Sequence, residues 1–133
     1  MKKILCLILM ANFAYSLTGD DFLQEFPFGK DEDDWDEVDR AEAIKYISYI
    51  DGWKAGNAMT IKIFEDFDIS TSTSHDLINI DLKTCGMSKG QIISLTKMWC
   101  DDNPDKTHFS FAVVVYRALL PLPTKSIKDC MER

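Results

Sequence analysis

The sequence predicts an all-α domain, a small bundle of about four helices with one long irregular connector. Apolar residues recur at three- and four-residue steps over residues 38–63, 88–103 and 106–120, which is the period of a helix buried along one side. Prolines follow two of these segments, at Pro104 and Pro121, and proline cannot continue a helix. The chain has 133 residues, and the 117 that follow a leader of 16 suffice for one domain.

The first residues have the features of an export signal. Two lysines precede an apolar run over residues 4–10, and the segment Ala14–Ser16 is a small-x-small cleavage site. The apolar run is too short to span a bilayer. We therefore expect cleavage after Ser16, no membrane insertion and a soluble product in the bacterial periplasm.

Residues 17–37 form an acidic N-terminal segment ahead of a single helical domain at residues 38–133. Its phenylalanines, among them Phe22, predict a short helix or turn that packs on the core. Residues 31–39 then hold seven acids in nine positions around Trp35. This strip is interpreted either as a solvated, partly disordered lead into a helix N-terminus, where acids suit the helix dipole, or as a docking site for a basic partner. Calcium binding is a weaker third reading, because the glycine and terminal glutamate of the known loop are missing.

A first long helix is predicted from Val38 towards Ile63. Gly52 and Gly56 interrupt it, and each costs up to about 1 kcal/mol relative to alanine. The two glycines lie four residues apart on one side, so the close approach of another helix would explain them.

Residues 64–82 are the least regular part. Residues 69–74 are polar and β-branched, which favours a loop, and residues 77–82 fit either a short strand or a helical turn. The segment is either a plain connector or a loop that carries binding residues.

A capped helix and a second helix make up the central part of the sequence. Ser88 and Gln91 form a capping-box pattern, and the helix should stop near Asn103. The predicted apolar side comprises Ile92, Leu95 and Trp99, flanked by Thr96 and Cys100.

The second helix is predicted from about Lys106 to Leu120. Its apolar side comprises Phe111, Val114, Val115, Ala118 and Leu119. Because the intervening turn is short, we expect the two helices to lie antiparallel.

Three cysteines remain after the leader, Cys85, Cys100 and Cys130. An odd number in an oxidising compartment indicates one disulfide with one leftover thiol, or pairing between chains. Cys100 lies beside Trp99 and suits a buried, apolar role, so a Cys85–Cys130 disulfide is predicted. No cysteine or histidine pair has zinc-ligand spacing.

The composition argues against catalysis and nucleic-acid binding. The net charge of −7 becomes −9 once Lys2 and Lys3 are removed, and such a chain repels polyanions and favours basic partners. No phosphate loop, metal motif or nucleophile–base pattern is present, so we expect neither a cofactor nor enzyme activity.

Four short motifs occur in a recognisable order: Tyr49-Ile50-Asp51-Gly52, Cys85 with Gln91 six residues later, Asn103-Pro104, and Ala118-Leu119. In this order the sequence resembles the Rap/Tai family of periplasmic immunity proteins, which protect against peptidoglycan-cleaving effectors of type VI secretion. Tyr46, Met87 and Thr124 stand where the family often has cysteine, proline and cysteine, so its usual disulfide pattern does not carry over.

The resemblance implies a mainly α-helical domain, often dimeric, that binds and occludes a cognate amidase toxin. On that basis the residues expected to contact the toxin are Asp66, Phe67, Asp68, His75 and Asp76, with the strip around Trp35 second. Two other classes stay open. One is a small periplasmic stress chaperone of the HdeA type, which opens in acid, and the other is a peptidoglycan or small-ligand enzyme with a perturbed carboxylate or histidine.

Overall fold

The computed structural model describes residues 17–68 and 72–131, and the export signal predicted for residues 1–16 lies outside them. Within the described residues the fold is all-α and holds six α-helices and two short 3-10 turns. The helices are α2 (Gly19–Glu25), α3 (Glu37–Asp66), α4 (Ser72–Thr84), α5 (Lys89–Asp102), α6 (Phe111–Leu119) and α7 (Ile127–Met131), and the turns are η1 (Glu32–Asp34) and η2 (Pro104–Lys106).

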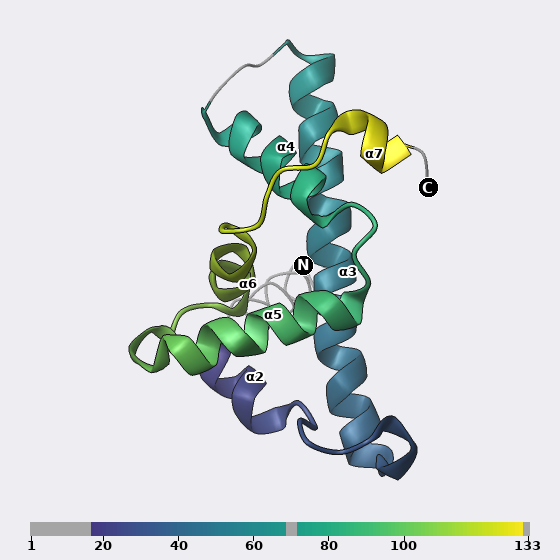
Figure 1. Ribbon diagram of the computed structural model, residues 1–133, viewed down its shortest axis with the longest axis vertical. Coiled ribbons are helices and arrows are strands. Elements are labelled where there is room, and N and C mark those ends of the chain that lie inside the picture. Colours follow the sequence, from purple (N-terminus) through teal and green to yellow (C-terminus); the bar gives the residue numbers. More distant parts are fainter. Residues whose placement is uncertain (1–16, 69–71, 132–133) are drawn as a thin grey trace, which may run out of the picture.

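The long helix α3 runs the length of the molecule, and helices α2, α4 and α5 pack against it (Figure 1). Its predicted start and course are confirmed, because it begins at Glu37 and continues past Ile63. Asp36 caps it, since its carboxylate accepts a 2.8 Å hydrogen bond from the backbone N–H of Asp39. The described helices number six, so the prediction of about four is too low.

The predicted approach of another helix to Gly52 and Gly56 of α3 is wrong for the described residues. Both glycines are exposed, and a Cβ built at either would have no heavy atom within 4 Å. Their cost to the helix, up to about 1 kcal/mol each, is therefore not offset by tighter packing in the described part of the chain.

The predicted irregular connector at residues 64–82 is wrong. Helix α3 extends to Asp66 and α4 begins at Ser72, so most of the segment is helical. Ile80 of α4 is buried in the common core, and Thr84 donates a 3.0 Å hydrogen bond to the carbonyl of Ile80. Burial against α3 and α6 thus decides the structure where weak local propensity does not.

Helix α5 begins and ends as predicted. Ser88 and Gln91 form the capping box, with hydrogen bonds of 2.8 and 3.2 Å, and the helix ends at Asp102, two residues before Pro104. The second helix starts later than predicted, at Phe111, because Pro104 opens the separate 3-10 turn η2.

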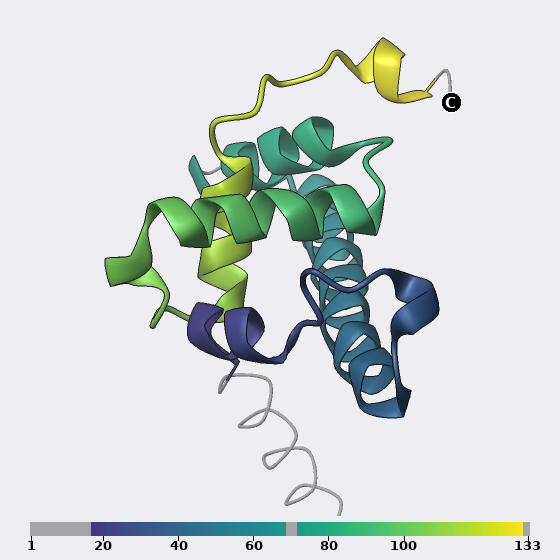
Figure 2. The same cartoon turned by 60° about the horizontal axis from the view of Figure 1, so that its bottom comes forward.

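Helices α5 and α6 cross steeply instead of lying antiparallel (Figures 1 and 2). The N-terminal segment occupies the space beside their connection. The N–H of Asp20 donates to the carbonyl of Thr107 at 2.8 Å, and the N–H of Phe111 donates to that of Leu17 at 2.8 Å. Only glycine fits at position 19, because a Cβ there would lie 2.7 Å from the carbonyl oxygen of Thr107.

Phe22 of α2 lies at the centre of the core. Its ring centroid is 4.9–5.2 Å from those of Phe28, Tyr46 and Phe111, and its side chain is fully buried. The predicted packing of the N-terminal aromatics on the core is therefore confirmed. The predicted apolar side of α6 is confirmed as well, since all five of its residues are buried.

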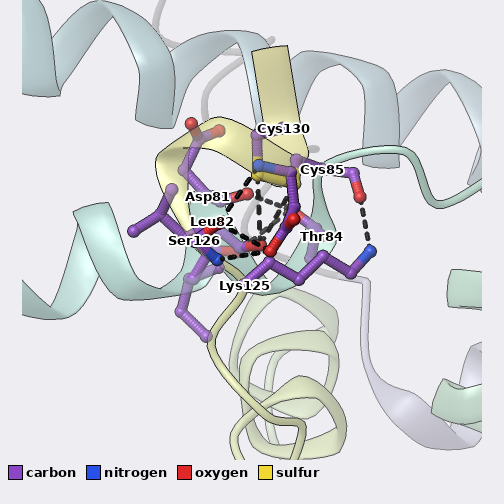
Figure 3. The surroundings of a disulfide bond; sticks show 9 residues. Asp81, Leu82, Thr84, Cys85, Lys125, Ser126 and Cys130 are labelled. Carbon is purple, nitrogen blue, oxygen red and sulfur yellow. Dashed lines mark hydrogen bonds between the residues drawn. A yellow bond between two sulfur atoms is a disulfide. The ribbon is translucent and has the colours of Figure 1, made fainter. Parts of the chain in front are cut away.

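The predicted Cys85–Cys130 disulfide is present, with Cα atoms 5.6 Å apart, and Cys100 is a buried free thiol. Figure 3 shows the disulfide joining the end of α4 to α7. Lys125 strengthens this attachment, because its ammonium donates a 2.6 Å hydrogen bond to the carbonyl of Cys85. The disulfide and the Lys125 hydrogen bond thus both attach the C-terminal tail to the end of α4.

Candidate protein-binding surfaces

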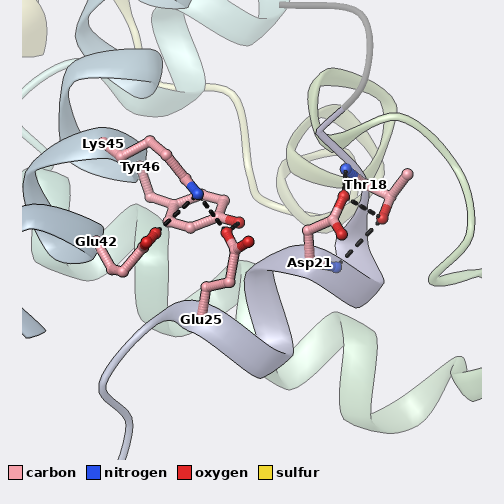
Figure 4. A network of polar contacts seen from close by, with 6 residues as sticks. All are labelled: Thr18, Asp21, Glu25, Glu42, Lys45 and Tyr46. Carbon is pink, nitrogen blue, oxygen red and sulfur yellow. Dashed lines mark hydrogen bonds and ion pairs between the residues drawn. The ribbon is translucent and has the colours of Figure 1, made fainter. Parts of the chain in front are cut away.

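A polar network joins α2 to α3 beside the aromatic core (Figure 4). The hydroxyl of Tyr46 donates a 2.5 Å hydrogen bond to Glu25. Lys45 pairs with the same carboxylate and, at 2.7 Å, with Glu42. The carboxylate of Glu25 therefore receives two donors from adjacent residues of α3.

The network shifts the pKa values of Glu25 and Tyr46 in directions that favour one protonation state of each. Burial raises the pKa of Glu25, but the hydrogen bonds from Lys45 and Tyr46 outweigh it, so the pKa lies below its ordinary value. Burial and the bond to Glu25 raise the pKa of Tyr46. These pKa shifts favour a charged carboxylate at Glu25 and a neutral phenol at Tyr46. Such fixed states suit a structural contact between two helices better than acid–base catalysis.

The end of α3 presents an exposed aromatic ring between acidic side chains. Phe67 caps the helix and is 74% exposed. Asp66 precedes it and Asp68 follows it in the left-handed region, with φ of 52°. Two backbone hydrogen bonds of 3.1 Å, from Phe67 to Ile63 and from Asp68 to Glu65, hold this tip in place. We refer to Asp66, Phe67 and Asp68 as the α3 tip.

The other residues of the first candidate surface belong to α4. The backbone of His75 and Asp76 is helical, but their side chains lie outside the described part of the chain. The structure therefore brings Asp66, Phe67 and Asp68 together at one tip, and the positions of the His75 and Asp76 side chains stay a prediction.

The strip around Trp35 is ordered structure, and its tryptophan is half-buried. The indole N–H donates to the carbonyl of Lys30 at 3.3 Å, and the ring packs edge-on against Phe26 at 6.1 Å. The acids around it are exposed, apart from Asp39, which pairs with Lys30 at 2.6 Å. The aromatic group of this strip is thus used within the fold.

The strip and the α3 tip cannot form one continuous surface. They lie at opposite ends of α3 (Figure 1), whose 30 residues span about 45 Å at a rise of 1.5 Å per residue. A partner that covers one of them leaves the other to solvent unless it reaches along the whole helix.

A groove of about 450 Å³ opens where α5, η2 and α6 meet. It is lined by Trp99 and Asn103 of α5, Lys106 of η2, Phe109, Arg117 of α6 and Leu120. Two cations beside two aromatic rings are a setting that accepts a carboxylate attached to an apolar group.

Sequence reasoning missed this groove. Arg117 is an isolated charge on the outer side of α6, and only the steep crossing of α5 and α6 brings it near Lys106 and Trp99. The sequence signals for those helices describe their buried sides and carry no information about the crossing angle.

The described residues contain no group of three or more histidine, cysteine or acidic side chains placed to hold a metal ion. None of the described helices combines the length and the apolar composition needed to cross a membrane. Comparisons of the chain with protein-family models, with characterised proteins and with solved structures found no match.

Proposed function

We propose that this protein is an exported immunity-type inhibitor that binds a peptidoglycan-degrading amidase toxin and covers its cleft without catalysing a reaction. The observation that carries the proposal is the α3 tip, where Phe67 is 74% exposed between two acidic residues at the end of a 30-residue helix. An aromatic side chain on a rigid support is the usual anchor of a tight interface. Flanking carboxylates guide such an anchor to a basic partner.

Two further observations support this function. Four short motifs in the sequence resemble, in the same order, those of the Rap/Tai family. The helical fold with its Cys85–Cys130 disulfide also fits a protein exported to an oxidising compartment such as the periplasm. The strip around Trp35 adds acidic charge at the far end of α3, where it would contribute to long-range attraction of a basic toxin.

The test uses the mature chain and a panel of purified peptidoglycan amidases that have basic rims around their clefts. Hydrolysis of purified cell-wall sacculi is followed by turbidity, and binding is followed by titration calorimetry. We expect one amidase to be bound and fully inhibited. Phe67→Ala should weaken that complex by about 30-fold, the loss of an interface anchor, while Met98→Ala, which shortens an exposed side chain on α5, should leave it unchanged.

The absence of binding and inhibition across the panel counts against the proposal. Inhibition that Phe67→Ala leaves intact would keep an inhibitory function but would place the contact elsewhere. Slow release of products by the protein alone would instead favour the enzyme class.

A further inference from the structure

The groove between α5, η2 and α6 is positively charged in an acidic protein. Lys106 and Arg117 line it and no carboxylate does, although the chain has 22 acidic against 15 basic residues. Neither cation forms an ion pair among the described residues, whereas Lys97 of α5 pairs with Asp101 at 2.6 Å. The groove therefore leaves two cations available for an anion that comes from outside the fold.

The acids nearest in the sequence do not neutralise these cations. Asp102 and Asp105 are exposed, form no ion pair among the described residues and do not line the groove. Arg117 also stands in the last turn of α6, where a cation suits the negative end of the helix dipole. That role alone would explain a solvated arginine, but it does not explain a second cation and two aromatic rings in the same groove.

Trp99 and Phe109 provide the apolar wall of the groove. Trp99 is half-buried, packs against the core and also lines the groove. Phe109 is 39% exposed and rests against His108, with the ring centroids 4.5 Å apart. The volume of about 450 Å³ lies in the range of sites for small ligands. An apolar group bound here would remove the exposed part of both rings from water.

Asn103 adds a hydrogen-bond acceptor whose orientation is fixed. Its side-chain N–H donates to the carbonyl of Trp99 at 2.8 Å, so its carboxamide oxygen points away from that bond. Among the described residues, this oxygen accepts only a 3.5 Å contact from the ammonium of Lys106, which is at the long limit for a hydrogen bond. An N–H of a ligand can take this place while the ammonium turns to an anionic group of the same ligand.

We propose that the groove binds the C-terminal residue of a peptide that ends in a large apolar side chain. The terminal carboxylate pairs with Arg117 and Lys106. The amide N–H of the same residue donates to Asn103, and its side chain packs on Trp99 and Phe109. An acylated amino acid carries these three groups around one carbon atom, so a peptide end matches the whole set, and capture of a terminal carboxylate is a known mode of peptide recognition.

The helix ends favour a carboxylate over a phosphate in this groove. Trp99 and Arg117 stand in the last turns of α5 and α6, where the helix dipole is negative. Phosphate sites use N–H groups at a helix N-terminus or in a glycine-rich turn, and no glycine lines the groove. A group with a single negative charge and two oxygens for the arginine fork is therefore the better match.

The groove is independent of the proposed inhibitory function. None of its lining residues belongs to the α3 tip. Phe67→Ala should therefore leave peptide binding unchanged, and Arg117→Gln should leave amidase inhibition unchanged. Either proposal can fail while the other holds.

NMR titration of the isotope-labelled mature chain with two ligands tests the proposal. N-acetylphenylalanine carries the three groups as a small acid, and acetyl-glycyl-glycyl-phenylalanine carries them at the end of a peptide. We expect both to shift the indole N–H signal of Trp99 and the carboxamide signals of Asn103, with dissociation constants below about 1 mM. The C-terminal amide of the tripeptide keeps the shape and lacks the charge, so it should bind about tenfold more weakly.

Two variants assign the charge to its place. Arg117→Gln should weaken binding of the tripeptide about tenfold, because the guanidinium is lost, and the exposed position of Arg117 leaves the fold in place. Lys62→Gln is the matched control, because it removes the same charge from an exposed residue of α3 that has no ion pair among the described residues. It should leave binding unchanged.

The contact with Asn103 is tested by phenylpropanoate, which lacks the N–H and should bind about fivefold more weakly than N-acetylphenylalanine. Equal binding of these two acids would overturn that contact and with it the peptide assignment. Binding of N-acetylphenylalanine without binding of the tripeptide would show a site for small acids and would overturn the assignment as well.

The absence of shifts at Trp99 and Asn103 with up to about 10 mM of either ligand would overturn the whole proposal. Equal binding of the tripeptide and its amide, or an equal loss in Arg117→Gln and Lys62→Gln, would do the same. The comparison of the tripeptide with its amide uses the parent protein, so it decides the proposal whatever Arg117→Gln does to the fold.

Discussion

The hydroxyl of Tyr46 and the carboxylate of Glu25, 21 residues apart in the chain, form a 2.5 Å hydrogen bond that joins α3 to α2. Tyr46 is fully buried, and its ring also contacts Phe22 and Phe111 at 5.2 and 5.1 Å. One residue thus contributes both to the aromatic core and to the polar network at its edge. The two contributions can be separated experimentally.

Replacing Tyr46 by phenylalanine keeps the ring and removes the donor. Glu25 then retains Lys45 but loses a hydrogen bond to a charged acceptor, so we expect the free energy of unfolding to fall by about 1–2 kcal/mol. Urea denaturation measures the loss. Tyr116→Phe on α6 is the control, since Tyr116 is half-buried and its hydroxyl makes no hydrogen bond among the described residues. Equal stability of the two variants would show that the Tyr46–Glu25 bond contributes nothing.

Phe22 should be among the most costly residues to truncate. Its side chain is fully buried and touches aromatic rings from three parts of the chain, so Phe22→Ala should lower the free energy of unfolding by about 3–5 kcal/mol. Leu23→Ala, one position along the same helix and only half-buried, should cost less. If Phe22→Ala cost no more than Leu23→Ala, α2 would be a peripheral attachment and not part of the core.

The Cys85–Cys130 disulfide should contribute substantially to stability, because it closes a segment with a sequence separation of 45 residues. The loop-entropy relation gives about 4 kcal/mol for a loop of this size. Cys130→Ser should remove most of this stabilising free energy, which would be measured as a lower urea midpoint. It should also expose the tail at Lys125 and Lys128 to trypsin.

Reduction of the parent protein should reproduce the effect of Cys130→Ser, and reduction of that variant should add nothing. Cys100 should not interfere, since burial and the nearby Asp101 raise the pKa of its thiol to about 11. A tail that resists trypsin after reduction would mean that the bond from Lys125 to Cys85 is sufficient to hold it.

Local sequence rules predicted much of the fold, because helix caps and the buried sides of helices depend on interactions between residues close together in the sequence. The Ser88–Gln91 capping box depends on residues three apart, and the apolar side of α6 depends on residues within nine positions. The Cys85–Cys130 pairing followed from the small number of cysteines and the apolar setting of Cys100. Each of these needs no knowledge of how the helices are arranged.

The parts that sequence reasoning missed depend on contacts between distant segments. Helix α4 is held by burial of Ile80 against other helices. The connection between the steeply crossing helices α5 and α6 is hydrogen-bonded to the distant N-terminal segment, through bonds between residues 17–20 and residues 107–111. Parts of the candidate site were missed for the same reason. The α3 tip was predicted as part of a loop, and the groove beside Arg117 follows only from the crossing angle.

Stability should fall on acidification because of Glu25 and Asp39. The pKa of Glu25 is lowered by its donors, which outweigh burial, and that of Asp39 is lowered chiefly by its hydrogen bond to Lys30. A carboxyl whose pKa is lower in the folded state stabilises the fold above its unfolded pKa and loses that contribution as pH falls through the folded value. The decline should therefore begin near the ordinary values of 4.5 and 3.8.

Above neutral pH, stability is expected to fall as pH rises instead of as it falls. Burial lowers the pKa of Lys45, but its bonds to Glu25 and Glu42 raise it more, so its contribution is present below 10.5 and is lost as pH rises through the folded value. Urea midpoints should consequently show a plateau from about pH 5 to about pH 10 with a decline on either side. Glu25→Gln should lower the plateau and flatten the acid decline, because the variant has no carboxyl to protonate at this position.

An acid decline in Glu25→Gln as steep as that of the parent protein would contradict this assignment. The same pH series separates the immunity function from the HdeA-type alternative. A chaperone of that type should begin to suppress light scattering by unfolding client proteins as the acid decline sets in, and Glu25→Gln should shift that onset. An inhibitor that acts by occlusion should lose amidase binding over the same pH range and show no client binding at any pH.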